Sequence, residues 1–490
     1  MQPNTVEIAH PDRLFIGGAW TPPQTGASIE IVSPSDESLV GRVAEARQAD
    51  VDVAVASARQ AFDEGPWPRL SGAERAAVLR RMADRVGERA EAFGRAWSLQ
   101  MGMPCSHSAP TGSRARTYFD YFAGLAEQGF EEVRTPAAGG ACVVVREPVG
   151  VVAAVAPWNA PLATLLLKVA PALAAGCTVI AKPSPETPIE ALLLAECAAE
   201  AGLPQGVLSV LPADREVSDY LIRKREIDKV SFTGSTAAGR HVAAICAERM
   251  ARFTMELGGK SAAIILDDAN IETVVAGIMP NLISLSGQQC AAFSRILVSN
   301  RRRAEVTEAL AAAFRSVQVG HAFDAATQMG PLVSQRQRER VCGYIDKGAA
   351  EGARIVTGGG RPAHLPKGWF VEPTLFTDVT NDMTIAREEI FGPVGVVIGY
   401  DTEEEAIAIA NDSDYGLSGA VFTEDVERAY AVGRRIRTGN FAQNTRVIDF
   451  TLPYGGFKLS GVGREGGIEG LHGFTEVKTV CLPRPPAHLA

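Results

Sequence analysis

The sequence has no cysteine pattern of a disulfide scaffold or a zinc site. Its eight cysteines are scattered, and the chain contains no C-x-x-C, no H-E-x-x-H and no cluster of cysteine with its seven histidines. Scattered cysteines in a chain without a secretion signal are typical of reduced thiols in the cytoplasm. We therefore expect a cytoplasmic protein, no metal site, and small buried side chains at most cysteine positions.

Long apolar runs are also missing. The longest stretch, at 162–181, is interrupted by Lys168, Pro171 and Gly176, which favours a buried helix followed by a buried strand. The N-terminal MQPNTVEIAHPDRLFIGG has no basic segment ahead of an apolar one, so we expect no signal peptide. Both observations predict a protein without a membrane partner.

A basic surface is absent as well. The formal net charge is −9, and no long run of one sign offsets it. Because binding to nucleic-acid phosphates needs clustered lysine and arginine, we expect no nucleic-acid partner.

What the chain does contain is a repeated alternation of strand and helix signals. From residue 148, short β-branched runs such as VGVVAAVAPW, CTVIAKPS and KVSFTGS alternate with alanine-rich helical segments. A second alternation of the same kind follows Glu256, and glycines within 256–262 mark the boundary. The 490 residues also exceed one typical core. The predicted fold class is α/β, with two doubly wound parallel-sheet domains.

Two segments predict strands outside these domains. GGACVVVREPVG at 139–150 has the pattern of a β-hairpin arm, and EVKTVCLPRP at 476–485 that of a strand without a local partner. Strands of this kind often pair between subunits, so we expect a β-arm for oligomerisation and a homodimer or homotetramer.

Three motifs have the chemistry to hold a nucleotide. FTGSTAAG places Gly234 and Ser235 between a predicted strand and helix, where N–H groups can meet a phosphate; a glycine turn with Ser235 as N-cap explains it equally well. Lys182 in CTVIAKPSP ends a strand of the same sheet and can reach a ribose or phosphate, or lie in solvent before a proline turn. Glu389 and Phe391 in EEIFGPV can flank a sugar diol and a flat ring, although a buried turn aromatic is the default.

Three further residues suit catalysis. In PWN, the Asn159 amide can stabilise an oxyanion or cap a turn. Glu256 in the glycine-rich MELGGKS can act as a general base or lie on the surface. Cys290 in SLSGQQCAAFSRILV is either a reactive nucleophile or a small core side chain, and the segment alone does not decide between them.

In their order along the chain, PWN, KPSP, FTGSTAAG, ELGGK, GQQC, EEIFGPV and PYGGFKLSGVGREGG resemble the NAD(P)-dependent aldehyde dehydrogenase superfamily. The resemblance runs from LFIGGAW at 14–20 to EVKTV at 476–480. It implies an acid-forming enzyme in which Cys290 attacks the aldehyde and Asn159 with the Cys290 N–H holds the oxyanion. Glu256 would activate the water that hydrolyses the thioester.

The resemblance also implies domain roles and a cofactor site. The domains are 1–126 with 148–256 for dinucleotide binding, 257–460 for catalysis, and 127–147 with 461–490 as oligomerisation arm and C-terminal strand. The implied cofactor residues are Pro157, Trp158, Lys182, Ser184, Gly234, Ser235, Gly258, Glu389 and Phe391. Members that prefer NAD often have K-P-x-E, whereas Pro185 stands there in this chain and Glu186 follows one residue late. NAD and NADP both stay open, with NAD slightly favoured.

Two alternative functions stay open beside this one. CoA-acylating semialdehyde dehydrogenases resemble the chain in fold but typically lack the glutamate, so Glu256 favours hydrolysis to a free acid. A non-enzymatic structural protein that retains the fold is disfavoured by the presence of Cys290, Glu256 and Asn159.

Small residues near the implied nucleophile predict a wide substrate tunnel. Ala160 and Ser284 stand where relatives acting on small aliphatic aldehydes frequently have aromatic side chains, which suggests a bulky or cyclic aldehyde. Gln289, Ala291 and Tyr454 are expected to line the same pocket. The segment GNFAQNT at 439–445 departs from the commoner G-x-V-x-V-N pattern, and no role for it follows.

Overall fold

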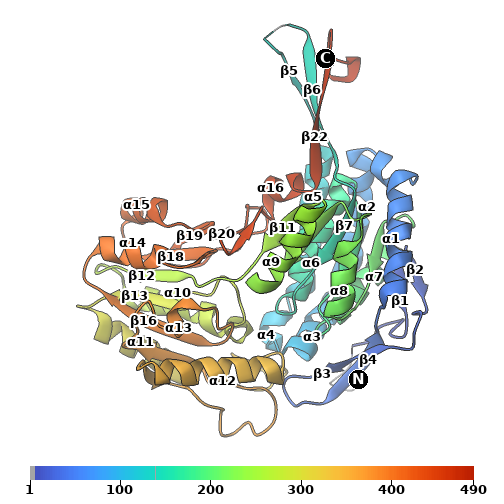
Figure 1. The fold of residues 1–490 in the computed structure, drawn as a ribbon. Coiled ribbons are helices and arrows are strands. Elements are labelled where there is room, and N and C mark those ends of the chain that lie inside the picture. The colour runs from blue at the N-terminus through green and yellow to red at the C-terminus, as the bar shows by residue number, and fades with distance from the viewer. Residues whose placement is uncertain (1–5, 138, 490) are drawn as a thin grey trace.

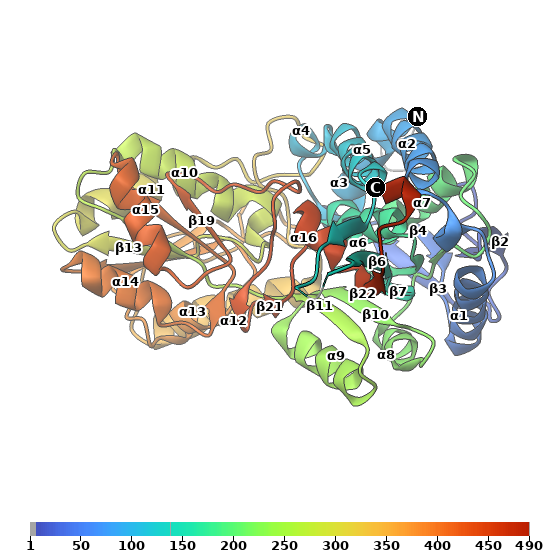
Figure 2. The same cartoon turned by 90° about the horizontal axis from the view of Figure 1, so that it is seen from above.

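The computed structural model describes residues 6–137 and 139–489. Parts of the predicted domains therefore lie outside the described residues, namely 1–5 in the first domain, 138 in the arm and 490 after the C-terminal strand. Two bodies, each built around a sheet, stand side by side, and a narrow sheet projects from the first of them (Figures 1 and 2).

The first body contains an eight-stranded sheet in the order β2-β1-β9-β8-β7-β10-β11-β21. Its strands are β1 (Leu14–Ile16), β2 (Ala19–Thr21), β7 (Val151–Val155), β8 (Thr178–Lys182), β9 (Leu208–Val210), β10 (Lys229–Thr233), β11 (Arg252–Glu256) and β21 (Gly461–Val462). Strands β7 to β11 run parallel. The central ones are completely buried and rich in Val, Ala and Ile, as expected of a sheet covered on both faces.

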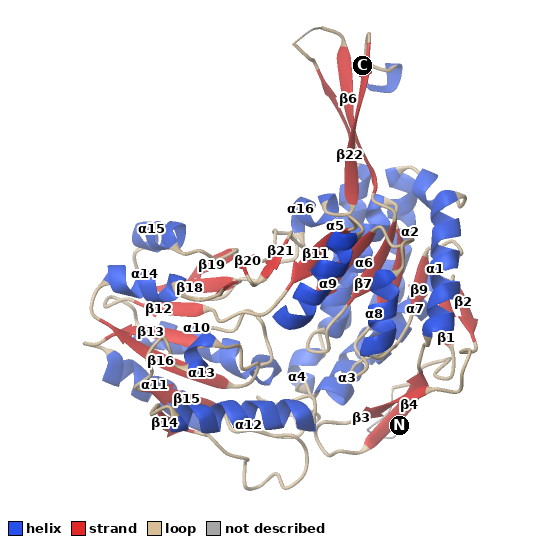
Figure 3. Cartoon of the chain, viewed as in Figure 1, coloured by secondary structure: helices blue, strands red, loops and turns tan. Residues whose placement is uncertain are grey.

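Helices cover both faces of this sheet (Figure 3). One face packs on α2 (Gly72–Glu88), α3 (Ala90–Met101), α5 (Thr111–Glu127), α6 (Pro161–Ala175) and α7 (Ile189–Glu200), and the other on α1 (Gln48–Asp63), α8 (Arg215–Arg223) and α9 (Thr236–Glu248). Alternation along β7 supplies both cores, because Val152 and Ala154 join the first while Val151 and Ala153 join the second. The chain order reverses between β7 and β10, and an open α/β sheet binds its ligands beyond the carboxyl ends at such a point.

The second body contains a seven-stranded sheet in the order β14-β15-β16-β13-β12-β18-β19. Its strands are β12 (Ala262–Ile265), β13 (Arg295–Ser299), β14 (Arg354–Thr357), β15 (Thr374–Thr377), β16 (Val394–Tyr400), β18 (Ser418–Phe422) and β19 (Asn440–Gln443). Only the β14–β15 pair is antiparallel. Helices α10 (Ile271–Ile283) and α11 (Arg303–Ser316) cover one face, and α12 (Gln335–Ala350), α13 (Thr384–Arg387), α14 (Glu403–Asn411) and α15 (Val426–Arg435) the other. The predicted α/β class with two doubly wound sheets is confirmed.

Short elements complete the fold. They are β3 (Ser28–Val32), β4 (Leu39–Ala44), η1 (Trp67–Arg69), α4 (Cys105–Ser108), η2 (Ser284–Gly287), β17 (Tyr415–Gly416), β20 (Phe457–Lys458), α16 (Gly467–His472) and η3 (Ala487–Leu489). Strands β3 and β4 form a hairpin, and β17 pairs with β20.

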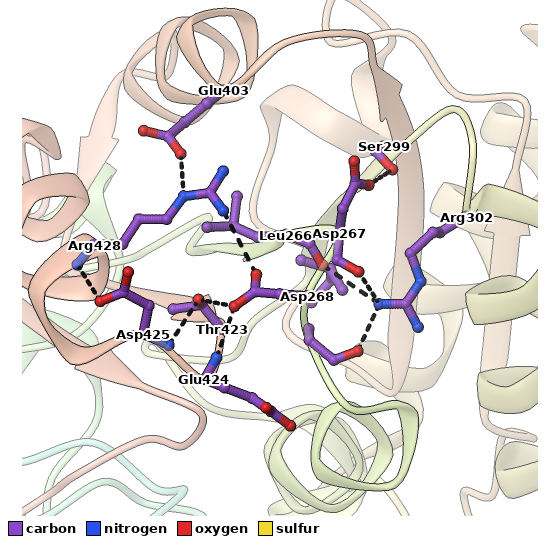
Figure 4. Close-up of polar contacts among 12 residues, drawn as sticks. Leu266, Asp267, Asp268, Ser299, Arg302, Glu403, Thr423, Glu424, Asp425 and Arg428 are labelled. Carbon is purple, nitrogen blue, oxygen red and sulfur yellow. Dashed lines mark hydrogen bonds and ion pairs between the residues drawn. The ribbon is translucent and has the colours of Figure 1, made fainter.

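The carboxyl ends of the second sheet are held together by side chains (Figure 4). Asp267, after β12, accepts a hydrogen bond from Ser299 at the end of β13. Asp268 accepts from the hydroxyl of Thr423, after β18, at 2.5 Å and lies 3.7 Å from Arg428. Lys260 and Cys290, in contrast, precede β12 and β13 and therefore lie toward the opposite end of the sheet.

The projecting sheet consists of β5 (Glu131–Arg134), β6 (Ala141–Pro148) and β22 (Thr475–Leu482) in the order β22-β6-β5. The predicted hairpin arm is present. However, β22 pairs with β6 of the same chain along all eight residues, from Thr475 opposite Pro148 to Leu482 opposite Ala141. The C-terminal strand, expected to lack a local partner, thus pairs with a distant segment of its own chain, because the tail returns to the arm after hundreds of intervening residues.

Two cysteines of this sheet are bonded to each other. Cys142 and Cys481 face each other on β6 and β22 with Cα atoms 4.1 Å apart and form a disulfide. The expectation of reduced thiols throughout is wrong for this pair, since the strand register brings together positions 339 residues apart in sequence. The cysteines at 105, 177, 197, 246, 290 and 342 are free.

Candidate active site

Cys290 follows a tight turn at the end of helix α10. Leu285 and Ser286 have φ of +54°, and Gly287 has φ of +71°, so three successive residues are left-handed. A Cβ on Gly287 would lie 2.2 Å from the carbonyl oxygen of Gly392, which only glycine avoids. The turn thus ends the helix abruptly and delivers the cysteine just before β13.

The Cys290 thiol is half-buried, with Sγ 3.7 Å from the Tyr454 hydroxyl. Burial raises the pKa of Cys290 to about 11; the Tyr454 hydroxyl and the Arg446 cation lower it, and the Glu389 and Glu256 carboxylates raise it. The thiol is therefore protonated at neutral pH in the free protein, and a nearby base is needed to make it a nucleophile.

Glu256 ends strand β11 and is 4% exposed. Burial and the Glu465 carboxylate raise the pKa of Glu256 well above its usual range, while Lys168 and Arg464 oppose the shift. Within the described residues neither of its carboxylate oxygens has a hydrogen-bond partner. A Cβ on Gly455 would lie 2.7 Å from one of them, so glycine leaves this carboxylate its space. A buried, unpaired carboxylate of raised pKa is a stronger base than an ordinary glutamate.

A buried ion pair lies behind Glu256. The Lys168 ammonium donates to the Glu465 carboxylate and, at 2.7 Å, to the Thr233 hydroxyl. The Glu465 backbone pairs with Tyr454 through hydrogen bonds of 2.7 and 2.8 Å. Sequence reasoning treated Lys168 only as an interruption of an apolar run and did not single out Glu465. A lysine inside a predicted buried helix was the available signal, because lysine is almost never fully buried without a partner.

Asn159 joins the two bodies at this point. Its Nδ2 donates a 2.8 Å hydrogen bond to the carbonyl of Gln288, and the Trp97 indole donates to the Asn159 carbonyl at 3.0 Å. Ala160, rather than Asn159, occupies the N-cap position of α6. The amide therefore lies against the cysteine loop, with a second N–H available for an oxyanion.

Aromatic rings from both bodies meet beside this amide. Pro157 and Trp158 follow β7, and the Trp158 ring lies edge-on to Phe391 with centroids 5.3 Å apart. Phe391 has φ of +62°, and Gln337 donates to its carbonyl at 2.7 Å. Gln337, which sequence reasoning missed, thus fixes the turn that presents the ring.

Glu389 lies against the glycine bend after Glu256. Its Oε1 accepts the Gly259 N–H at 3.0 Å, and burial raises its pKa to about 7. A Cβ on Gly258 would lie 2.4 Å from Glu389 Oε2, so the carboxylate can approach only a glycine. Arg340, also missed, donates to the Glu389 carbonyl at 2.6 Å.

The remaining predicted nucleotide residues lie at neighbouring strand ends. Lys182 ends β8 and is buried, which lowers its pKa to about 8. Ser184 donates to Glu186, whose carboxylate therefore turns back toward the strand. Ser235 caps α9 by accepting the N–H of Ala238. The Ser235 side chain therefore caps the helix, which is the alternative that the sequence left open. Its backbone nevertheless lies at the start of α9.

The predicted pocket residues differ in how far their side chains are exposed. Ala160 and Ser284 are half-buried, whereas Ala291 is only 2% exposed and lies in the core. Gln289 is held by the carbonyls of Asn281 and Ser284, at 3.0 and 2.9 Å.

No helix in the described part of the chain is long and apolar enough to cross a membrane. The same residues contain no group of three or more metal-ligating side chains.

Known proteins resemble this chain over most of its length. The aldehyde dehydrogenase family matches residues 20–480. Geranial dehydrogenase of Castellaniella defragrans is 45% identical over 98% of the chain and 99% of its own length. Betaine aldehyde dehydrogenase of Rhizobium leguminosarum is 40% identical over 96% and 97%. The crystal structure of the Mycobacterium tuberculosis aldehyde dehydrogenase complexed with NAD+ is 47% identical, with a TM-score of 0.95 over 97% of this chain and 99% of that one.

The chain belongs to the aldehyde dehydrogenase family. It is an NAD(P)-dependent oxidoreductase that oxidises an aldehyde to a carboxylic acid. The superfamily, the enzyme class and the NAD(P) dependence predicted from the sequence are confirmed.

Proposed function

We propose that Cys290, Asn159 and Glu256 carry the reaction. Glu256 accepts the thiol proton, the sulfur of Cys290 adds to the aldehyde carbon, and the oxyanion of the thiohemiacetal is held by the Asn159 amide and the Cys290 N–H. The nicotinamide of NAD(P)+ supplies the hydride acceptor when the cofactor is bound. After it has released the first proton to solvent, Glu256 takes a proton from water, whose oxygen attacks the carbon of the resulting thioester. The Cys290 thiolate then leaves and the acid is released.

The hydrogen bond from Asn159 to the Gln288 carbonyl carries this proposal, because it puts an amide donor next to the cysteine loop. Cys290→Ser should abolish NAD(P)H formation, since a serine hydroxyl is a far weaker nucleophile. Cys342→Ser, at another half-buried free thiol, is the matched control and should keep full activity. Activity that survives in Cys290→Ser contradicts the assignment, and turnover that requires free CoA would favour the acylating alternative.

The residues around the strand ends fit a dinucleotide, and we propose that it binds across them. Lys182 and Ser184 would hold the adenosine ribose, Gly234 and Ser235 the pyrophosphate, and Glu389 the nicotinamide ribose. Pro157, Trp158, Gly258 and Phe391 would surround the nicotinamide. The buried Lys182 cation and the room left by Gly258 support this assignment. The first body, with 1–126 and 148–256, would be the dinucleotide-binding domain, 257–460 the catalytic domain, and 127–147 with 461–490 the arm and C-terminal strand.

We propose NAD as the preferred cofactor. Glu186 follows the expected position by one residue, yet its carboxylate accepts a hydrogen bond from Ser184 and lies close enough to Lys182 to raise the lysine pKa. A carboxylate there can bind a ribose diol and repels a 2′-phosphate. The NAD+ complex of the Mycobacterium tuberculosis enzyme supports the same preference.

For the substrate we propose a bulky or cyclic aldehyde. The small, half-buried Ala160 and Ser284 support a wide tunnel. Gln289 and Tyr454 would lie around it, and the buried Ala291 would contribute to its wall from within the core. The relative at 45% identity is a geranial dehydrogenase, which points the same way. Turnover of acetaldehyde, benzaldehyde and geranial tests this, and a strong preference for acetaldehyde contradicts it.

We propose that the enzyme is a homodimer or homotetramer. All four residues of β5, an edge strand of the projecting sheet, are exposed. The strand β19, an edge of the seven-stranded sheet, borders a groove of about 350 Å³ lined by Val426, Tyr430 and Phe441. Two unpaired edges on one chain are suited to pairing with a second copy. The mass of the particle in solution tests this, and a monomer contradicts it.

We propose a cytoplasmic location. The disulfide between Cys142 and Cys481 argues against it, because disulfides are rare in the cytoplasm. Trapping free thiols in intact cells decides the point. Two alkylated cysteines would support the cytoplasm, while a protected pair would favour an oxidising compartment.

A further inference from the structure

The Arg446 guanidinium lies near the Cys290 sulfur, and this cation has no carboxylate partner among the described residues. It lies in the loop between β19 and β20, and its Nη1 donates to Gln289 Oε1 at 2.5 Å. Within the described residues no carboxylate forms an ion pair with this guanidinium, and the groups that raise its pKa are Tyr454 and Cys290. Sequence reasoning found no role for the segment just before it.

The contact with Gln289 fixes where this cation lies. The Gln289 amide nitrogen is already bound to the carbonyls of Asn281 and Ser284, so its oxygen must face away from them and toward Arg446. Gln289 directly precedes Cys290, and Tyr454 Oη is 3.7 Å from Cys290 Sγ. Arg446 and Tyr454 both lie close enough to Cys290 to lower the pKa of its thiol.

A cation in this environment needs an anion. Arg446 is half-buried, and burial lowers its pKa, which means that lost hydration is not fully replaced. A guanidinium has five N–H donors, of which Gln289 takes one. Leaving a partly desolvated charge unpaired is unfavourable, and a carboxylate held by two parallel N–H donors is its best partner.

We propose that Arg446 is a specificity-determining residue that binds a carboxylate at the far end of the substrate, so that the preferred aldehydes are oxo acids. The inference rests on the proposed function, because it places the aldehyde carbon at Cys290. The small Ala160 and Ser284 leave room for the body of such a molecule, while Gln289 keeps the guanidinium turned toward it. The neutral geranial fits the width of this pocket but offers Arg446 no anion.

The test compares aldehydes that differ only in charge. A series of ω-oxo acids of graded chain length, each with its primary amide, and geranial as a neutral bulky aldehyde are assayed for kcat/KM. In the wild type the best acid should exceed its amide by about 10- to 100-fold, the usual value of a hydrogen bond to a charged group. Arg446→Met should bring the acid-to-amide ratio of kcat/KM close to 1. The readout is this ratio, because loss of the cation also raises the Cys290 pKa and slows both substrates by the same further factor. Arg446→Lys, which keeps the charge without the planar fork, should retain part of it.

The controls separate this inference from its competitors. Arg301→Met, at a surface arginine with an 86% exposed side chain, should leave kcat/KM unchanged for both the acid and the amide. Equal wild-type rates on acid and amide, or geranial preferred over every acid, overturn the inference. If Arg446→Met lowers kcat/KM equally for the acid and the amide, so that their ratio does not change, the inference is also overturned. The cation would then act only on the Cys290 thiolate. No turnover of any aldehyde would instead refute the proposed function, so the two failures are distinguishable.

Discussion

Lys168 and Glu465 form an ion pair in the interior, with side chains 0% and 3% exposed, and both act on Glu256. The lysine favours the ionised form of Glu256 and the glutamate opposes it. The two members of the pair therefore have opposite effects on the pKa of the residue proposed as the catalytic base.

Substitution of either member should move the pH dependence of turnover in opposite directions. Glu465→Gln removes a like charge, lowers the pKa of Glu256 and shifts the acidic limb of the kcat profile to lower pH. Lys168→Met removes the favourable charge and shifts that limb to higher pH. Shifts in the same direction would mean that the pair does not act on Glu256 through its charge.

The same substitutions should also lower stability. Breaking a buried ion pair leaves an uncompensated charge and costs about 3–5 kcal/mol of unfolding free energy. Denaturant unfolding measures this loss of stability. If Lys168→Met does not fold, the pH dependence of kcat can still be measured in Glu465→Gln.

Tyr454 should control the reactivity of the Cys290 thiol. Alkylation of Cys290 in the cofactor-free enzyme should accelerate roughly tenfold per pH unit below its pKa of about 11. Because the tyrosine hydroxyl lowers that pKa, Tyr454→Phe should raise it and slow alkylation at fixed pH by about 3- to 10-fold. Mass spectrometry follows the Cys290 peptide, with Cys290→Ser as the blank. Faster alkylation of Tyr454→Phe would refute the contact.

Gly259 should be essential for the position of the nucleophile. A Cβ at this glycine would lie 2.1 Å from the carbonyl oxygen of Cys290, so Gly259→Ala must displace the cysteine loop. A displacement of about 1 Å can reduce kcat by roughly 100-fold. Gly343→Ala is the matched control, because nothing lies within 4 Å of its added methyl in helix α12. It should leave kcat unchanged and stabilise the helix by up to about 1 kcal/mol.

Glu186 should decide between the two cofactors. Glu186→Gln removes the charge that opposes a 2′-phosphate and should raise the NADP-to-NAD ratio of kcat/KM by about tenfold. Glu200→Gln, on the exposed end of α7 and paired with Arg89, is the control and should leave the ratio unchanged. An unchanged ratio in Glu186→Gln would show that the carboxylate does not face the ribose.

Local pattern was enough to predict the two sheets and the motifs at their ends. The runs of Val, Ala and Ile that became β7 and β8 are buried on both faces, which is a property of strand composition. Glycines at 258 and 259 likewise marked the bend between the bodies, because close approach of Glu389 and Cys290 admits no side chain there.

The sequence by itself determined the α/β class, the family and the identity of the residues proposed for catalysis, since each depends on short motifs beside predicted strands. Only the tertiary structure paired Cys142 with Cys481, Lys168 with Glu465 and Arg446 with Gln289. Each of these pairs joins positions more than 150 residues apart, across strand registers and loops that no local pattern specifies. The last two of these contacts set the charge around Cys290 and Glu256, and with it the proposed choice of substrate.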